Sequence, residues 1–304
     1  MFVLAHLSDP HLGPIPTPRP RDIINKRGLG LINWYRKRHR HHHRDVLNAI
    51  VRDVHMHTPG HIAVTGDLVN ISLDAEFENA ARWLAEVGPP ADVTLVPGNH
   101  DAYIRRAAGH AAQHWGDYMR GDTLPETGVN AVSHGAAFPF VRRRGPLALI
   151  GLTTSLPTGP LMATGRLGGA QLARFAEILI ELAREPVFRV VLIHHPPIPN
   201  RGHYMKRLID GPIFRALVAE HGAELILHGH NHEQQLAWLD GPHGRVPAVG
   251  VPSASAIISD HDEPAAYNTY RVSGEPGAWH CDMVVRGFRA GQNGIGELMR
   301  KALR

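Results

Sequence analysis

Five short blocks of this 304-residue chain combine histidine, aspartate or asparagine with glycine or proline, in a spacing that could bind metal ions. In chain order they are Asp9-Pro10-His11, Gly66-Asp67, Gly98-Asn99-His100-Asp101, His194-His195-Pro196 and Gly229-His230-Asn231-His232. In the pairs Asp9/His11 and His230/His232 the two residues stand two positions apart. On an extended backbone such side chains point to the same face, so we expect each pair to hold a metal ion from one side.

The donor atoms of these blocks limit the metals that they could hold. Imidazole and carboxylate without thiolate suit Zn, Mn, Fe or Co. The single cysteine, Cys281, excludes a thiolate zinc site and a disulfide framework. A carboxylate at a strand end, such as Asp67, can bridge two ions, and the neutral amide of Asn99 suits a second ion that already has histidine ligands.

Each block follows a short apolar run that predicts a β-strand. These runs are residues 2–7, 62–65, 92–96, 190–193 and 225–227. Ligand sites in α/β sheets form outside the carboxyl ends of the strands, so we expect the five blocks to converge in space. His6 and His228 stand inside the apolar runs, and we expect them to be hydrogen-bonded core histidines rather than ligands.

Longer amphipathic stretches alternate with these strands. Their apolar spacing predicts helices at 45–57, 74–87, 109–119, 169–183 and 208–221, and further strands at 138–142 and 147–152. This alternation is typical of parallel strands joined by right-handed crossovers. Short strands at 236–239, 246–251, 266–272 and 279–285 should complete the sheets in antiparallel fashion, and a short helix is expected at 295–303. We predict one α/β domain over residues 1–304, with a C-terminal tail at 286–304.

The blocks D-x-H, G-D, G-N-H-D, H-x-P and G-H-x-H, in this order, resemble the calcineurin-like metallophosphoesterase superfamily. The resemblance covers residues 9–232, and every block is present. It implies a two-sheet β-sandwich flanked by helices on both outer faces, the αββα arrangement. It also implies a first metal held by Asp9, His11, Asp67 and His232, and a second held by Asp67, Asn99, His194 and His230.

The same resemblance implies hydrolysis of phosphate esters by a metal-bridging hydroxide, with two divalent ions (Mn, Fe, Zn or Co) as cofactors. It places His100 over the substrate phosphate and has Asp101 orient the other ring nitrogen of His100. His195, at the variable position after a ligand histidine, and Arg38 are candidate substrate-binding residues. Members of the fold that serve only as protein-binding scaffolds are expected to lose the histidine of G-N-H-D, which is present here.

The expected substrate is a small phosphate ester. A compact chain with this set of blocks is most similar to the bacterial cyclic-nucleotide-type phosphodiesterase branch, which implies a nucleotide-type diester. The alternative is a lipid-linked pyrophosphate at the membrane surface, similar to the substrate of the UDP-diacylglucosamine hydrolases. That alternative depends on an insertion at residues 19–44, directly after the first block.

The insertion at 19–44 contains nine Lys or Arg residues against one acid, Asp22, whereas the whole chain carries a net charge of +4. Leu29, Ile32, Trp34 and Tyr35 precede its basic cluster. Because this segment directly follows the first block, we expect it at the rim of the active site. Three interpretations remain open for it: a solvated helix with an apolar inner face, capture of an anionic substrate, or contact of residues 29–44 with anionic lipid. Nucleic-acid binding is disfavoured, because no second basic stripe supports it.

Composition restricts the class of protein further. The apolar fraction of 43% is that of a globular chain. No apolar run approaches the ~18 residues that a spanning helix needs, and the amino terminus shows no signal-peptide pattern. We expect a cytoplasmic protein, at the inner membrane face if residues 29–44 bind lipid.

Overall fold

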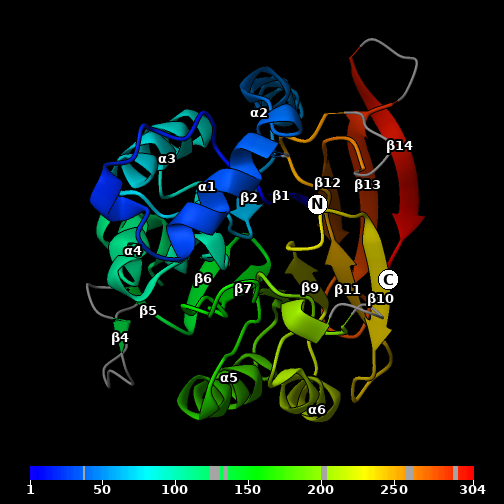
Figure 1. Ribbon diagram of the computed structural model, residues 1–304. Coiled ribbons are helices and arrows are strands. Elements are labelled where there is room, and N and C mark those ends of the chain that lie inside the picture. Colours follow the sequence, from blue (N-terminus) through cyan, green and yellow to red (C-terminus); the bar gives the residue numbers. More distant parts are fainter. Residues whose placement is uncertain (37, 123–130, 133–135, 200–203, 258–262, 290–293) are drawn as a thin grey trace.

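The computed structural model describes residues 1–36, 38–122, 131–132, 136–199, 204–257, 263–289 and 294–304. Two six-stranded mixed sheets pack between helices (Figure 1). The first sheet has the order β14–β13–β12–β1–β2–β3 and the second the order β10–β11–β9–β8–β7–β6. The structure confirms the expected α/β sandwich of two sheets with flanking helices.

The elements have the following bounds. The first sheet consists of β1 (Phe2–Leu7), β2 (His61–Val64), β3 (Val93–Leu95), β12 (Ala266–Ser273), β13 (His280–Phe288) and β14 (Ile295–Ala302). The second consists of β6 (Phe140–Arg144), β7 (Leu147–Gly151), β8 (Phe188–Leu192), β9 (Leu225–His228), β10 (Gln235–Leu239) and β11 (Val246–Gly250). A small separate pair is formed by β4 (Ala131–Val132) and β5 (Ala136–Ala137). The helices are α1 (Lys26–Arg36), α2 (Arg44–Met56), α3 (Asp74–Val87), α4 (His110–Trp115), α5 (Gly169–Leu182) and α6 (Gly211–His221).

Strand directions follow the expected division of the chain except at β11, which was expected to be antiparallel but pairs with β9 in parallel and with β10 in antiparallel fashion. β1, β2 and β3 are parallel, as are β7, β8 and β9, whereas β12, β13 and β14 add to the first sheet in antiparallel fashion. The carboxyl ends of the parallel strands in each sheet therefore lie at one edge.

Alternation along the strands of the second sheet divides its side chains between two cores. Leu147 and Leu149 of β7 belong to the large core between the sheets, whereas Ala148 and Ile150 belong to the core under α5 and α6. Successive side chains of a strand point to opposite faces, so both faces of this sheet are covered. Figure 1 shows α5 and α6 on the outer face.

The helix expected at 295–303 is wrong: this segment is strand β14, paired in antiparallel fashion with β13. Its Glu, Leu, Met, Arg, Lys and Ala residues favour a helix, but the open edge of β13 offers backbone hydrogen bonds that outweigh this weak preference. Of the tail expected at 286–304, residues 286–288 therefore belong to β13, and β14 forms the outer edge of the first sheet. Charged side chains on it, such as Arg300 and Lys301, are typical of a protected edge strand.

Candidate metal centre

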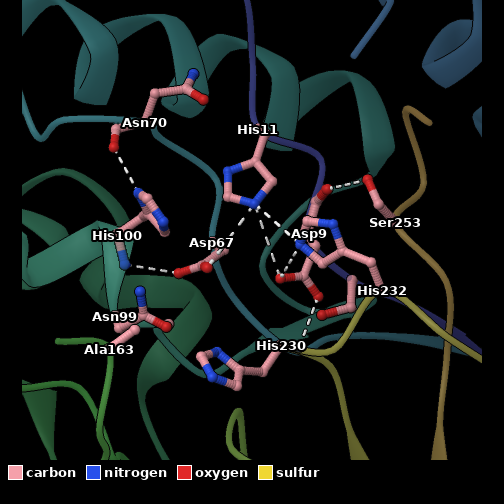
Figure 2. A network of polar contacts seen from close by, with 12 residues as sticks. Asp9, His11, Asp67, Asn70, Asn99, His100, Ala163, His230, His232 and Ser253 are labelled. Atoms are coloured by element: carbon pink, nitrogen blue, oxygen red, sulfur yellow. Dashed lines mark hydrogen bonds and ion pairs between the residues drawn. The ribbon is translucent and has the colours of Figure 1, made fainter. Parts of the chain in front are cut away.

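The five sequence blocks meet at the carboxyl ends of strands from both sheets. Asp9 follows β1, Asp67 follows β2, Asn99 follows β3, and the blocks with His194 and His230 follow β8 and β9. Figure 2 shows the side chains of Asp9, His11, Asp67 and His232 pointing toward one another. The first sheet thus contributes both carboxylates together with His11 and Asn99, and the second sheet contributes three imidazoles.

The first group of donor atoms surrounds the Asp9 carboxylate. Asp9 Oδ1 lies 3.3 Å from His232 Nε2 and 3.9 Å from His11 Nε2. The Nε2 atoms of His11 and His232 are 3.2 Å apart, and His11 Nε2 lies 3.8 Å from Asp67 Oδ2. These are the four residues that the resemblance assigns to a first metal (Figure 2).

The second group surrounds His194 Nε2. This atom lies 3.4 Å from Asp67 Oδ2, 3.2 Å from His230 Nδ1 and 3.3 Å from Asn99 Oδ1. Asp67 is common to both groups, which is the geometry that a bridging carboxylate requires.

The donor set fits divalent cations. Asp9 Oδ1 is buried and forms no hydrogen bond, although an orphaned buried carboxylate oxygen is costly unless a cation satisfies it. His194 Nδ1 donates a hydrogen bond to Thr65 O at 2.6 Å, and His11 Nδ1 lies 3.3 Å from Val69 O. Such contacts fix the tautomer and leave Nε2 of each ring available as a ligand atom.

Charge complementarity already exists without ions. Burial alone would raise the pKa of Asp67, but the nearby His194 ring holds it well below its usual range. Burial likewise opposes protonation of His194, yet attraction to Asp67 prevails and raises the pKa of His194 to about 9.

Several candidate ligands have strained backbones. Among the described residues, eight residues other than glycine have a positive φ, and five of them are candidate ligands: Asp9 (52°), His11 (38°), Asp67 (56°), His230 (73°) and His232 (58°). This left-handed region costs about 1–3 kcal/mol per residue and persists only where the surroundings enforce it. Here the loops hold one another, since Asp9 N donates to Gly66 O at 3.0 Å and His230 N to Asp9 Oδ2 at 3.0 Å.

These conformations correct one expectation. The pairs Asp9/His11 and His230/His232 are not extended. His230 and His232 face different groups of donor atoms, His194 and Asp9 respectively. His232 therefore belongs to the first group of donor atoms and His230 to the second, although they stand two residues apart.

His100 lies beside both groups. Its backbone N–H donates to Asp67 Oδ1 at 2.7 Å, and its Nδ1 donates to Asn70 O at 2.5 Å. Burial and the charge of Arg38 lower the pKa of His100 to about 3, so the ring is neutral. Its Nε2 carries the free lone pair.

Asp101 does not orient the ring of His100, contrary to the expectation. Its carboxylate accepts hydrogen bonds from the backbone N–H groups of Asp67, Leu68, Val69 and Gly98. Both carboxylate oxygens of Asp101 are thereby bonded to the loop that carries Asp67. The ring nitrogen Nδ1 of His100 donates to the Asn70 carbonyl oxygen instead. Asp101 fixes the position of Asp67.

His195 is not placed to bind substrate. It is buried, its Nε2 donates to Ala163 O at 3.0 Å, and its Nδ1 accepts from Thr154 Oγ1 at 2.7 Å. Its ring packs against that of His230 with centroids 4.2 Å apart. His195 therefore supports the His230 ring. His6, as expected of a core histidine, is buried and bonded to Thr65 Oγ1 at 2.9 Å.

A cavity of about 560 Å³ opens above the donor atoms. Its lining includes Asp67, Asn99, His100, His230 and His232 on one side. The insertion at 19–44 supplies Asn33, Arg36, Arg38, Arg40, His41 and His42, and Lys206 completes the positive wall. Arg38 Nη1 lies 3.4 Å from His100 Nδ1.

Sequence reasoning missed Asn70 and His42. Asn70 stands three positions after Asp67, a spacing that could have singled it out. His42 belongs to the run 41–43, which gives no sign of which histidine faces the site.

Comparison with known proteins decides the family. A family model described as calcineurin-like phosphoesterase matches residues 2–234. The chain belongs to this family. Calcineurin-like phosphoesterases are metal-dependent, in agreement with the two His/Asp groups.

One protein is similar to this chain in sequence, and two solved structures are similar to it in fold. A protein of Synechococcus sp. (strain ATCC 27144 / PCC 6301 / SAUG 1402/1), described as a probable cyclic nucleotide phosphodiesterase, is 24% identical over 238 residues, which are 77% of this chain and 80% of the relative. A dimetal phosphatase from Danio rerio shares the fold with a TM-score of 0.63, 11% identity and coverage of 99% and 98% of the two chains. A purple acid phosphatase from yellow lupin gives a TM-score of 0.52, with 12% identity and coverage of 97% and 53%.

Among the described residues of this calcineurin-like phosphoesterase, none of the helices combines the length and apolar character of a membrane crossing.

Proposed function

We propose that this calcineurin-like phosphoesterase is a dinuclear phosphodiesterase acting on a small nucleotide-type substrate. The observation that carries the proposal is the pair of donor groups that share Asp67 and open on one cavity. Asp9, His11, Asp67 and His232 would hold one ion, and Asp67, Asn99, His194 and His230 the other. Mn, Fe, Zn and Co all accept this donor set.

When bound, the two ions would lower the pKa of water near a phosphate ester and offset the charge of the transition state. The chain supplies the remaining functions. The positive wall of Arg36, Arg38, Arg40 and Lys206 would attract and orient an anionic ester. The relative described as a probable cyclic nucleotide phosphodiesterase supports a diester as that ester.

His100 is the candidate proton donor to the leaving group. It is neutral in the free protein, with its proton at Nδ1 on Asn70 O. An anionic phosphoryl group beside Nε2 would favour uptake of a second proton from solvent at Nε2, which charges the ring. The charged ring could then donate from Nε2 to the leaving oxygen, a contribution typically worth about 10²–10⁴-fold.

The test is hydrolysis of bis(p-nitrophenyl) phosphate, p-nitrophenyl phosphate and 3′,5′-cyclic AMP by the Mn²⁺-loaded protein. We expect turnover of both diesters to exceed that of the monoester. Arg38→Gln, which keeps the metal groups intact, should raise KM for cyclic AMP more than it lowers kcat. Faster turnover of the monoester would contradict the proposed specificity.

A lipid-linked substrate is the second candidate, because apolar side chains are exposed at the cavity rim. Leu29, Ile32 and Tyr35 of α1 are 52%, 51% and 61% exposed, while Trp34 of the same helix is buried. Leu161 and Tyr204, near the lining residues Ala163 and Lys206, are also exposed. Apolar residues beside basic ones are typical of a surface that binds anionic lipid.

Sedimentation with phosphatidylglycerol vesicles tests this candidate. We expect binding that is lost when Leu29, Ile32 and Tyr35 are all replaced by serine, but kept in Met56→Ser, which removes an exposed apolar side chain of α2. Equal sedimentation of both variants would contradict a role for the α1 face.

A further inference from the structure

His42 comes from the insertion at 19–44, yet it lies against the first group of donor atoms. Its ring centroid is 4.8 Å from that of His11 and 5.7 Å from that of His232. One nitrogen from each of these three rings lies within 4.8 Å of the others. The cavity above the site is lined by His42 and His232 together.

The backbone around His42 is held by the segment that follows β11. His42 forms an antiparallel bridge with Ala256, His43 N donates to Ser255 O at 2.9 Å, and Ile257 N donates to His41 O at 2.9 Å. The insertion is therefore attached to the sheet framework immediately beside the site.

The ring of His42 is oriented by the same segment. Its Nδ1 lies 2.8 Å from Ser255 Oγ, a hydrogen bond that leaves Nε2 as the remaining ligand atom. Ser253 Oγ of this segment donates to Asp9 O at 2.6 Å, and Ala254 N donates to Ser8 O at 2.9 Å. One short segment thus positions both His42 and Asp9, which is how outer hydrogen bonds normally orient metal ligands.

We propose that His42 is an additional protein ligand of the first metal ion, supplied by the insertion. The proposal rests on the two-metal assignment above and adds a residue that the five blocks do not contain. An extra neutral imidazole would strengthen binding of the ion held by Asp9, His11 and His232. It would also favour ions that prefer nitrogen donors, such as Zn²⁺ and Co²⁺, over Mn²⁺ at that position.

The test measures metal binding without substrate. Metal-free wild type, His42→Ala and His43→Ala are titrated with Co²⁺ by calorimetry, and the visible absorption of the bound Co²⁺ is recorded. His43 is the matched control, because it is exposed on the same segment and its side-chain Nε2 lies 3.3 Å from Arg40 O, away from the donor atoms. Circular dichroism of the metal-free proteins checks that each variant is folded.

We expect wild type and His43→Ala to bind two ions with the same affinities. In His42→Ala one of the two affinities should fall at least about tenfold, since even outer-sphere partners of ligands are worth 10–100-fold. The absorption bands of one Co²⁺ ion should shift as well. Ser255→Ala, which keeps the His42 ring but removes its hydrogen bond, should weaken the same site by a smaller factor.

Two results would overturn the proposal, and they are distinguishable. Two ions bound to His42→Ala with wild-type affinities and spectra would show that His42 is no ligand, and would leave the two-metal assignment intact. A wild-type protein that binds no ion would overturn the two-metal assignment together with the role of His42. If His42→Ala does not fold, Ser255→Ala decides by the same criteria.

Discussion

Asp67 is the residue on which both groups of donor atoms depend. Its Oδ2 lies 3.8 Å from His11 Nε2 and 3.4 Å from His194 Nε2, while its Oδ1 accepts the backbone N–H of His100. Four backbone contacts to the neighbouring Asp101 carboxylate hold the loop in place. A change at this single residue should therefore affect both metal positions.

Asp67→Asn should bind fewer than one metal ion per chain and lose turnover, because the amide removes the shared negative charge. Metal content measured by plasma mass spectrometry checks this. Asp45→Asn, which neutralises an exposed carboxylate of α2, is the control and should keep two ions. Two ions bound to Asp67→Asn would exclude a bridging role.

His100→Ala should keep both ions but lower kcat at least about 100-fold, since general acid catalysis is commonly worth 10²–10⁴. Steady-state kinetics on a diester, with metal content measured on the same samples, checks this. Full activity of the variant would remove His100 from the catalytic residues.

At the scale of elements, the site depends on close contact between the loops that follow β2 and β3. A Cβ added to Gly98, after β3, would overlap Asp67 Oδ1 and the Asp67 backbone nitrogen. It would also approach the His194 ring to 2.7 Å. These atoms belong to backbone or to packed ligands, so they have little room to move.

Gly98→Ala should lower the free energy of unfolding by about 1–3 kcal/mol, the usual cost of overpacking, and should weaken metal binding. Gly116→Ala is a matched control, because a Cβ there meets no atom within 4 Å. Thermal unfolding and metal titration of the two variants check this. Wild-type metal affinity in Gly98→Ala would show that the loops can separate without disturbing the ligands.

At the scale of the whole molecule, helix α2 is tied to the first sheet by a charged contact. Asp53 of α2 accepts hydrogen bonds from Tyr267 Oη at 2.6 Å and from Arg286 Nε at 2.8 Å. Burial alone would raise the pKa of Asp53, but hydrogen bonds from Arg286 and Tyr267 prevail and hold it below its usual range. A carboxylate with a lowered pKa stabilises the folded state at pH above its unfolded pKa, and this contribution disappears as the pH falls through the folded pKa.

Asp53→Asn should therefore destabilise the protein by about 1.5–3 kcal/mol at pH 7, the range for hydrogen bonds to charged groups. The difference from wild type should shrink as the pH falls below about 4. Urea unfolding at pH 7, 5 and 3.5 measures it. A difference that does not change with pH would show that the charge of Asp53 contributes nothing.

Local patterns in the sequence suffice for much of this protein. Hydrophobic spacing predicts α3 at its observed bounds and α2, α5 and α6 within three residues at each end. The strand-end blocks predict which histidines, aspartates and asparagine converge. They do so because a parallel strand brings whatever follows it to one edge of the sheet, wherever it lies in the chain.

Contacts between segments distant in sequence decide the rest. β14 is a strand because β13 offers it a free edge. Asp101 holds a loop because its carboxylate accepts hydrogen bonds from four backbone N–H groups and none from the His100 ring. His195 is enclosed by Thr154 and Ala163. His42 is brought to the site by a segment more than 200 residues later in the chain. Sequence by itself determined which residue types could do the chemistry, and tertiary structure decided their partners, because a hydrogen bond depends on position in space and not on spacing along the chain.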